Sequence, residues 1–150
     1  MHRRSFLLTG AGFAALVLTP GIAVAGKAKV YMPGGAGASG YDVVAYFTES
    51  RPVKGDLAIS VSHDGAKWYF ASEDNRQAFL ANPAKHAPQY GGYCAFAVSQ
   101  GYTASTDPEA WTVHDGKLYL NYSKGVRSRW ERDVPGYISL GNRNWPAVLN

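Results

Sequence analysis

The sequence has a single cysteine, few charged residues and no long apolar run, and each shortage excludes something. One cysteine among 150 residues rules out a disulfide within the chain. With 15 basic and 11 acidic side chains, the charge excess is too small to indicate a nucleic-acid-binding surface. No segment reaches the roughly 20 apolar residues that a membrane helix needs. A chain of this length with 46% apolar residues indicates one globular domain with a hydrophobic core.

Familiar enzyme motifs are also missing. Neither Ser99 nor Ser105 lies in a serine-hydrolase elbow, no glycine-rich phosphate loop is present, and no carboxylate pair stands in a recognisable active-site motif. A hydrolase is therefore not expected, and a binding module is a better expectation than an enzyme.

Residues 1–25 have the pattern of a cleavable export signal. Arg3 and Arg4 precede an apolar run over residues 6–18, and the small residues Ala-Val-Ala at 23–25 end the segment. The paired arginines followed by Ser-Phe-Leu resemble the twin-arginine signal, although an ordinary secretory signal also carries basic residues. We therefore expect a periplasmic or otherwise exported protein without a membrane span after cleavage.

Residues 26–40 contain a glycine-rich stretch that begins at Gly34. A segment of Gly, Ala and Ser has little to bury, so we expect a flexible leader here. The folded domain is then expected to comprise residues 41–150.

Alternating apolar and polar residues predict two β-hairpins in the folded domain. Each hairpin has a tight Asp-Gly turn, at residues 64–65 and 115–116. A helix capped by Ser72 should end before Pro83, and a second helical segment should end near Pro135. The expected fold is α+β, a small single domain with two antiparallel β-hairpins and several short helices. A hairpin followed by a helical segment that ends near a proline occurs twice. This order fits either a degenerate internal repeat or two unrelated hairpins.

Several motifs resemble those of YHS domains. Residues 68–85 combine an aromatic strand (WYF), a serine-capped helix (SEDN) and a closing Asn-Pro, which resembles the YHS core pattern. Around it, GYDVVAYF at 40–47, YGGYCAFAVSQG at 90–101, DPEAW at 107–111 and LYLNY at 118–122 resemble a longer, exported YHS-domain subfamily. The resemblance implies the handling of a soft metal ion such as copper through cysteine.

The sequence departs from that family pattern at several positions. Ala71 and Asn75 occupy positions that are commonly cysteine in metal-handling YHS modules, so the usual thiolate site is absent. His86 stands where the family more often has tyrosine. The longer subfamily resembles one whose members carry selenocysteine at the position of Cys94, which implies redox chemistry or soft-metal ligation there.

Cys94 is the residue on which the functional hypotheses depend. Gly91 and Gly92 allow a tight turn that brings backbone N–H groups toward a thiolate, and such a setting lowers the pKa of a thiol. A packed, inert thiol is an equally good expectation. One thiolate does not complete a metal site, and His86 is the first candidate for a second ligand, ahead of the two histidines next to the hairpin turns.

Three hypotheses follow from these observations. The leading one is a periplasmic binding or accessory module that engages a soft metal ion, copper or similar, or a partner thiol through Cys94 with His86. The second is a thiol-redox protein in which an external thiol resolves oxidised Cys94. The third is a non-catalytic interaction domain in which Cys94 only packs.

Overall fold

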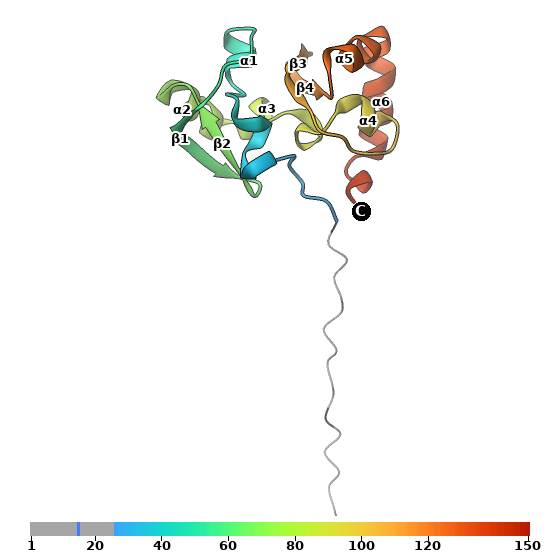
Figure 1. Ribbon diagram of the computed structural model, residues 1–150, viewed down its shortest axis with the longest axis horizontal. Helices are drawn as coiled ribbons and strands as arrows, with labels where there is room; N and C mark the ends of the chain where they lie inside the picture. The colour runs from blue at the N-terminus through green and yellow to red at the C-terminus, as the bar shows by residue number, and fades with distance from the viewer. Residues whose placement is uncertain (1–14, 16–25) are drawn as a thin grey trace, which may run out of the picture.

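The computed structural model, which describes residues 15 and 26–150, has one antiparallel hairpin at one side and a second near the middle of the domain (Figure 1). The predicted export signal lies outside the described residues except for Ala15. The first hairpin consists of β1 (Asp56–His63) and β2 (Ala66–Phe70), and the second of β3 (Asp107–His114) and β4 (Lys117–Asn121). Helices accompany both hairpins, and this composition confirms the predicted α+β class.

The helices are short, and serine side chains cap two of them. Their bounds are α1 (Ala45–Thr48), α2 (Glu73–Ala81), α3 (Pro83–His86), α4 (Ala95–Ser99), α5 (Lys124–Trp130) and α6 (Val134–Asn144). The hydroxyl oxygens of Ser72 and Ser123 accept the backbone N–H of Asn75 and Val126, each at 3.1 Å. These bonds satisfy N–H groups that have no partner within the helix. The predicted start of α2 at Ser72 is confirmed.

Short 3-10 turns join these elements. They are η1 (Pro33–Gly35), η2 (Gly37–Gly40), η3 (Gln89–Gly92), η4 (Glu131–Asp133) and η5 (Ala147–Leu149). The helical segment expected to end near Pro135 is interrupted: α5 ends at Trp130, and Pro135 lies in the first turn of α6. A proline fits the first turn because its missing N–H would have no helical partner there. No helix among residues 26–150 combines the length and apolar character needed to cross a membrane.

One arrangement of elements occurs twice, in residues 37–81 (the first unit) and 89–130 (the second unit). Each unit has a 3-10 turn, a short helix, a hairpin with a register shift near its start, and a serine-capped helix. The turn backbones also match, because residues 38–40 have φ of 49°, 54° and 85° and residues 90–92 have φ of 57°, 64° and 83°. Two unrelated hairpins would not share these flanking turns, so the structure favours the internal repeat.

The two hairpins differ in how they are buried. In β2 the side chains of Trp68 and Phe70 are buried whereas Lys67 is exposed, so one face meets the core. In β4 residues 118–121 are all buried. Leu118 and Leu120 pack into the core of the first unit, and the Tyr119 side chain between them packs into the core of the second. The second hairpin therefore separates two hydrophobic cores.

Residues 26–40 pack on the domain, so the expectation of a flexible leader is wrong. Val30 is buried in the first core, and the Tyr31 N–H donates to the Gly91 carbonyl at 3.0 Å. Gly37 lies against the Trp68 indole, where a Cβ would come within 2.6 Å of the ring. The absent side chain permits close packing here, and the folded domain includes residues before Tyr41.

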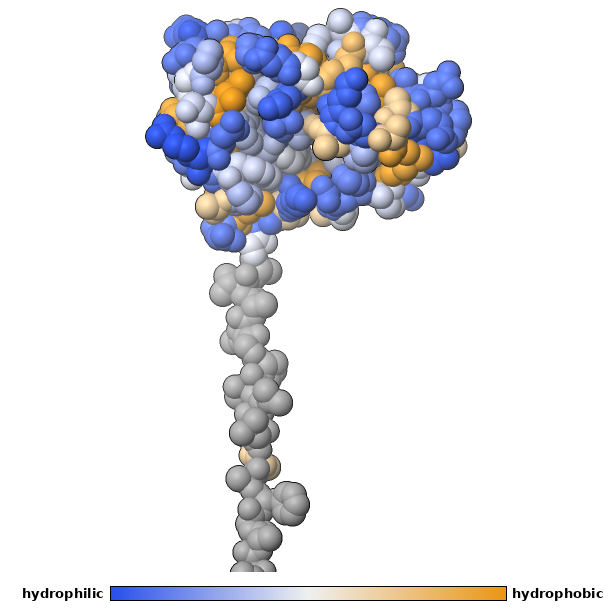
Figure 2. Space-filling view, turned by 180° about the vertical axis from the view of Figure 1, so that it is seen from behind, coloured by the Kyte–Doolittle hydropathy of each residue, from blue (hydrophilic) through white to orange (hydrophobic). Residues whose placement is uncertain are grey.

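One face of the domain carries apolar residues in separate places (Figure 2). Figure 2 shows, from behind, apolar patches that polar residues separate from one another. The large apolar side chains that remain exposed include Leu57 and Leu80 in the first unit and Tyr102 and Tyr122 in the second. The two tyrosines are of further interest because both line the cavity described below.

Candidate functional site

Cys94 lies between η3 and α4, and its side chain is 1% exposed. Its backbone N–H donates to the Ala104 carbonyl at 3.0 Å, which fixes the residue against the loop before β3. The thiol donates to Asn121 Oδ1 with a sulfur–oxygen distance of 3.5 Å, and the Tyr122 N–H donates to the sulfur at 3.3 Å. The resting thiol therefore both donates and accepts a hydrogen bond.

The first unit has Asp42 at the position equivalent to Cys94. Each residue lies two positions after the last glycine of its 3-10 turn. The Asp42 N–H donates to the Val53 carbonyl at 2.8 Å, just as the Cys94 N–H donates to Ala104. The same place in the repeated fold therefore carries a carboxylate in one unit and a thiol in the other.

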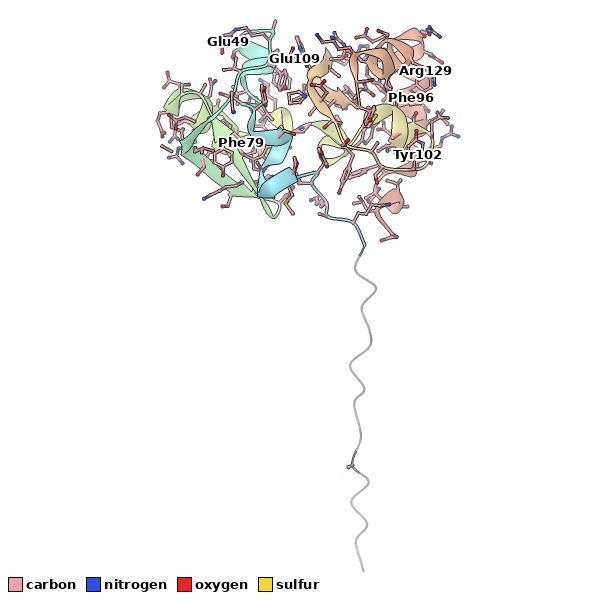
Figure 3. All side chains as sticks on the ribbon, in the orientation of Figure 1. Glu49, Phe79, Phe96, Tyr102, Glu109 and Arg129 are labelled. Atoms are coloured by element: carbon pink, nitrogen blue, oxygen red, sulfur yellow. The ribbon has the colours of Figure 1, made fainter. Side chains whose placement is uncertain are left out.

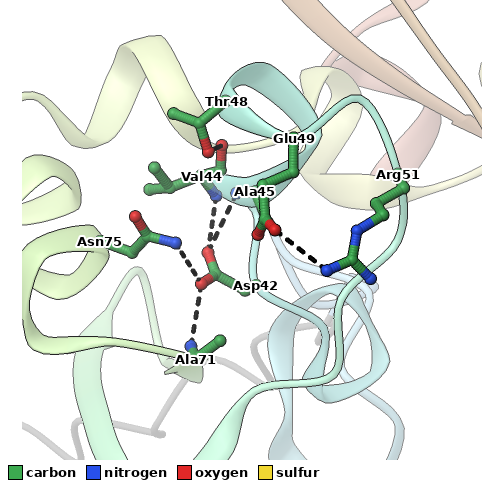
Figure 4. Close-up of polar contacts among 8 residues, drawn as sticks. All are labelled: Asp42, Val44, Ala45, Thr48, Glu49, Arg51, Ala71 and Asn75. Atoms are coloured by element: carbon green, nitrogen blue, oxygen red, sulfur yellow. Dashed lines mark hydrogen bonds and ion pairs between the residues drawn. The ribbon is translucent and has the colours of Figure 1, made fainter.

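The Asp42 carboxylate is completely buried and accepts four hydrogen bonds (Figure 4). Oδ1 accepts the backbone N–H groups of Val44 at 2.9 Å and Ala45 at 3.2 Å. Oδ2 accepts the Ala71 N–H at 2.9 Å and the Asn75 side-chain amide at 2.7 Å. Hydrogen bonds of this kind satisfy a buried charge, so the fold places several N–H donors around one anionic position here.

Equivalent backbone donors surround Cys94. The Tyr122 N–H corresponds to that of Ala71, because each follows the last residue of its hairpin. The Phe96 N–H corresponds to that of Val44, but it donates to Asn121 Oδ1 at 3.0 Å. The Asn121 amide oxygen therefore accepts the N–H group whose equivalent in the first unit donates to the Asp42 carboxylate.

Sequence reasoning missed Asn121. This side chain is completely buried, and its Nδ2 has no hydrogen-bond partner among the described residues. In the first unit the equivalent last residue of the hairpin is Phe70, an ordinary core residue. A polar residue at the end of the apolar segment LYLN was the only signal in the sequence, and it did not reveal that the amide contacts Cys94.

Burial raises the pKa of the Cys94 thiol, whereas N–H groups of Ala97, Tyr122 and Phe96 lower it by a smaller amount. The net direction is opposite to the lowering expected from the glycine turn. The N–H groups that act on the sulfur belong to Ala97, Tyr122 and Phe96, and none of them lies in the glycine turn. The resting group is therefore a neutral thiol.

A cavity of about 290 Å³ lies next to Cys94. Cys94, Phe96 and Ala97 line it, together with Tyr102 and Tyr122, which are 51% and 57% exposed. The remaining lining residues are Ala104, Val126 and Arg129. Figure 3 shows Phe96, Tyr102 and Arg129 together in the half of the molecule that contains α4 and α5. Cys94 is therefore buried and lies next to a cavity.

Val126 explains part of the difference between the two positions. It is equivalent to Asn75, because each donates its backbone N–H to the serine that caps its helix. In the first unit the Asn75 amide closes the carboxylate site, whereas Val126 lines the cavity and offers no hydrogen bond from its side chain. The side chain of Cys94 therefore has fewer hydrogen-bond donors around it than the side chain of Asp42.

His86 has neighbours that differ from those of Cys94. It is buried at the end of α3, with Nδ1 3.0 Å from the Asn82 carbonyl oxygen and its ring edge-on to Phe47 at 5.5 Å between centroids. His86 does not line the Cys94 cavity. Within residues 26–150, no group of three His, Cys, Asp or Glu side chains is placed to hold a metal ion.

The two histidines next to the hairpin turns contact residues of those turns. His63 and His114 each place Nε2 3.4 Å from the carboxylate of the following aspartate, Asp64 or Asp115. His63 also packs edge-on against Phe79, which Figure 3 labels in the first unit. Neither histidine lines the Cys94 cavity.

Comparisons with protein-family models, curated proteins and solved structures found no match for this chain. The resemblance to YHS domains therefore stays a prediction from the sequence motifs. Any function has to be inferred from the geometry around Cys94.

Proposed function

We propose that the protein is an exported binding module of the YHS type that carries a soft metal ion, copper(I) first among them, on the sulfur of Cys94. The observation that carries the proposal is the difference between two equivalent positions. Four N–H donors surround the Asp42 carboxylate, whereas the Cys94 sulfur accepts one backbone N–H and the residue lines a cavity. Soft sulfur ligands such as a thiolate favour copper(I), as well as zinc and iron–sulfur clusters.

The described residues provide one ligand of such a site. Neither His86 nor any cluster of metal-ligating side chains joins Cys94, and one thiolate does not complete a metal site. The remaining ligand would therefore come from outside through the cavity. A site completed from outside suits cargo that is exchanged with a donor or an acceptor, and His86 is not part of this proposal.

Binding exchanges a proton for the metal ion. The thiol proton leaves to solvent, the sulfur–copper bond forms, and the Tyr122 N–H continues to donate to the sulfur. Because burial raises the pKa of Cys94, the free protein is protonated at neutral pH. The apparent affinity should therefore fall about tenfold for each pH unit below the thiol pKa, since each bound ion releases one proton.

Copper(I) affinity of the exported protein tests this proposal. We expect competition against a chromophoric copper(I) chelator, in the presence of a small thiol, to give one ion per chain and the stated pH dependence. Cys94→Ser should lose the stoichiometric binding, and the matched His86→Gln variant should retain it. Equal binding by the wild type and Cys94→Ser would overturn the proposal.

The thiol-redox hypothesis has less support from the geometry. A thiol with a raised pKa presents little thiolate at neutral pH, and the thiolate is the form that oxidants attack. Peroxide reactivity that is faster than that of an unfolded control peptide would reverse this preference.

A further inference from the structure

A second cavity, which we call the α6 cavity, lies between the second hairpin and α6. It measures about 430 Å³, within the roughly 300–1,000 Å³ found for small-molecule sites. Its wall is formed by side chains from residues 114–119 on the hairpin and residues 135–142 on α6. None of these residues lines the Cys94 cavity, so the two cavities are separate.

Tyr119 in the wall of the α6 cavity has a hydroxyl without a protein partner. The residue is 3% exposed, and its ring centroid lies 5.1 Å from that of Trp130. The three other buried tyrosines, Tyr46, Tyr90 and Tyr93, donate their hydroxyls to protein oxygens at 2.8, 3.0 and 2.7 Å. Among residues 26–150 the Tyr119 hydroxyl makes no such bond, although buried tyrosines usually find one. This hydroxyl is therefore available to a ligand in the cavity.

The equivalent aromatic residue of the first unit is satisfied within the protein. Trp68 and Tyr119 are each the third residue of the second strand in their hairpin. Trp68 Nε1 donates to the His63 carbonyl at 2.9 Å, and the Tyr119 hydroxyl has no counterpart of this bond in the described part of the chain. The second unit thus leaves a polar atom open where the first unit closes it.

The carboxylates of the two hairpin turns differ in the same direction. Besides the adjacent histidine, Asp64 pairs with Lys29 Nζ at 3.3 Å, whereas Asp115 pairs with no residue of 26–150 beyond its adjacent histidine. Burial raises the pKa of the Tyr119 phenol, and the Asp115 carboxylate raises it further. The phenol oxygen and this carboxylate therefore lie near each other on the wall of the α6 cavity.

The opposite wall, on α6, adds a hydroxyl and an amide. Ser139 and Asn142 both line the cavity and are three residues apart, which places them on one face of the helix. Asn142 Oδ1 accepts the Tyr90 hydroxyl at 3.0 Å, which leaves its Nδ2 to donate elsewhere. Lys117 also lines the cavity, and its formal charge cancels that of Asp115. The wall therefore offers both donors and acceptors without a net charge from these two residues.

We propose that the α6 cavity binds a small neutral molecule rich in hydroxyl groups, such as a monosaccharide, with one ligand hydroxyl bonded to Tyr119. A hydroxyl both donates and accepts, so several of them match the mixed groups of Asp115, Ser139 and Asn142. An anion would meet the Asp115 carboxylate, and a cation would meet the Lys117 ammonium. The site does not involve Cys94 and is independent of the function proposed above.

Titration with small molecules of different charge tests the ligand class. Two-dimensional NMR spectra of the isotope-labelled protein are recorded with glucose, galactose and mannose, and with glycine and phosphate as a zwitterion and an anion. We expect at least one hexose to give saturable shifts confined to the second hairpin turn and α6, with a dissociation constant on the order of millimolar. Shifts at these residues from glycine or phosphate alone, or no saturable shift from any probe, would overturn the proposal.

Tyr119→Phe tests the role of the hydroxyl, because it removes one oxygen and keeps the ring. The affinity for the bound hexose should fall roughly three- to tenfold, as for one lost hydrogen bond. The melting temperature should not fall, because this hydroxyl has no protein partner to lose. Ser139→Ala, at an exposed position of α6, should also weaken binding.

Tyr93→Phe is the matched control. It removes a hydroxyl that donates to the Ala28 carbonyl at 2.7 Å and lies outside the α6 cavity. This variant should have a lower melting temperature and an unchanged affinity for the hexose. Equal affinity of the wild type and Tyr119→Phe would overturn the proposal, as would an equal loss in Tyr119→Phe and Tyr93→Phe.

Discussion

The two units of the fold use the same backbone position for different purposes. Asp42 in the first unit is buried, saturated by four donors and remote from solvent, and it ties α1 to the end of the first hairpin and to α2. Cys94 in the second unit keeps the Tyr122 donor but lies beside a cavity. The comparison teaches that a structural anion position can become a ligand position when the side chains around it change.

Three substitutions between equivalent positions account for the difference. Cys94 replaces Asp42, Val126 replaces the amide of Asn75, and Asn121 replaces Phe70. The first removes a charge, the second removes a closing hydrogen bond, and the third places a polar group against the sulfur. The backbone is retained throughout, including the left-handed turn before each position.

The largest expected effect concerns the first unit. Asp42→Ala leaves three backbone N–H groups and the Asn75 amide without their acceptor, so we expect the free energy of unfolding to fall by at least about 3 kcal/mol. Cys94→Ala removes one weak acceptor and should lower it by only about 1 kcal/mol. Urea denaturation of both variants measures the difference. Equal losses of free energy of unfolding in the two variants would contradict the view that Asp42, unlike Cys94, serves mainly to stabilise the fold.

A smaller and symmetrical effect is expected at the helix caps. Ser72→Ala and Ser123→Ala each remove one bond of 3.1 Å, so each should lower the free energy of unfolding by about 1 kcal/mol. The same denaturation measurement applies, with Ser128→Ala as an exposed serine control on α5. A loss in one unit only would show that the repeat does not extend to the energetics of its helices.

Local signals in the sequence predicted most of the fold. The Asp-Gly turns, the alternating strands and Ser72 each depend on neighbouring residues, and the structure confirms them. The packing of residues 26–40 could not be predicted in this way, because the glycine-rich stretch packs against the distant Trp68 and the residues before it bind the distant Gly91. Glycine indicates flexibility in isolation but permits close approach when a partner is present.

The candidate site was predicted only in part. Cys94 stood out as the single cysteine, but its raised pKa depends on burial that the sequence does not reveal. Its equivalence to Asp42 and its contact with Asn121 become visible only when the two units are compared in space. The pairing with His86 stays a prediction, and the contacts of His86 with Phe47 and Asn82 do not favour it.

X-ray absorption at the copper edge tests most directly whether Cys94 is one half of a metal site completed from outside. The spectrum is recorded on the copper(I)-loaded protein in the presence of a small thiol. We expect two sulfur ligands, one from Cys94 and one from the small thiol, with no imidazole scattering. A spectrum with a histidine ligand, or one that is unchanged in Cys94→Ser, would contradict the proposal.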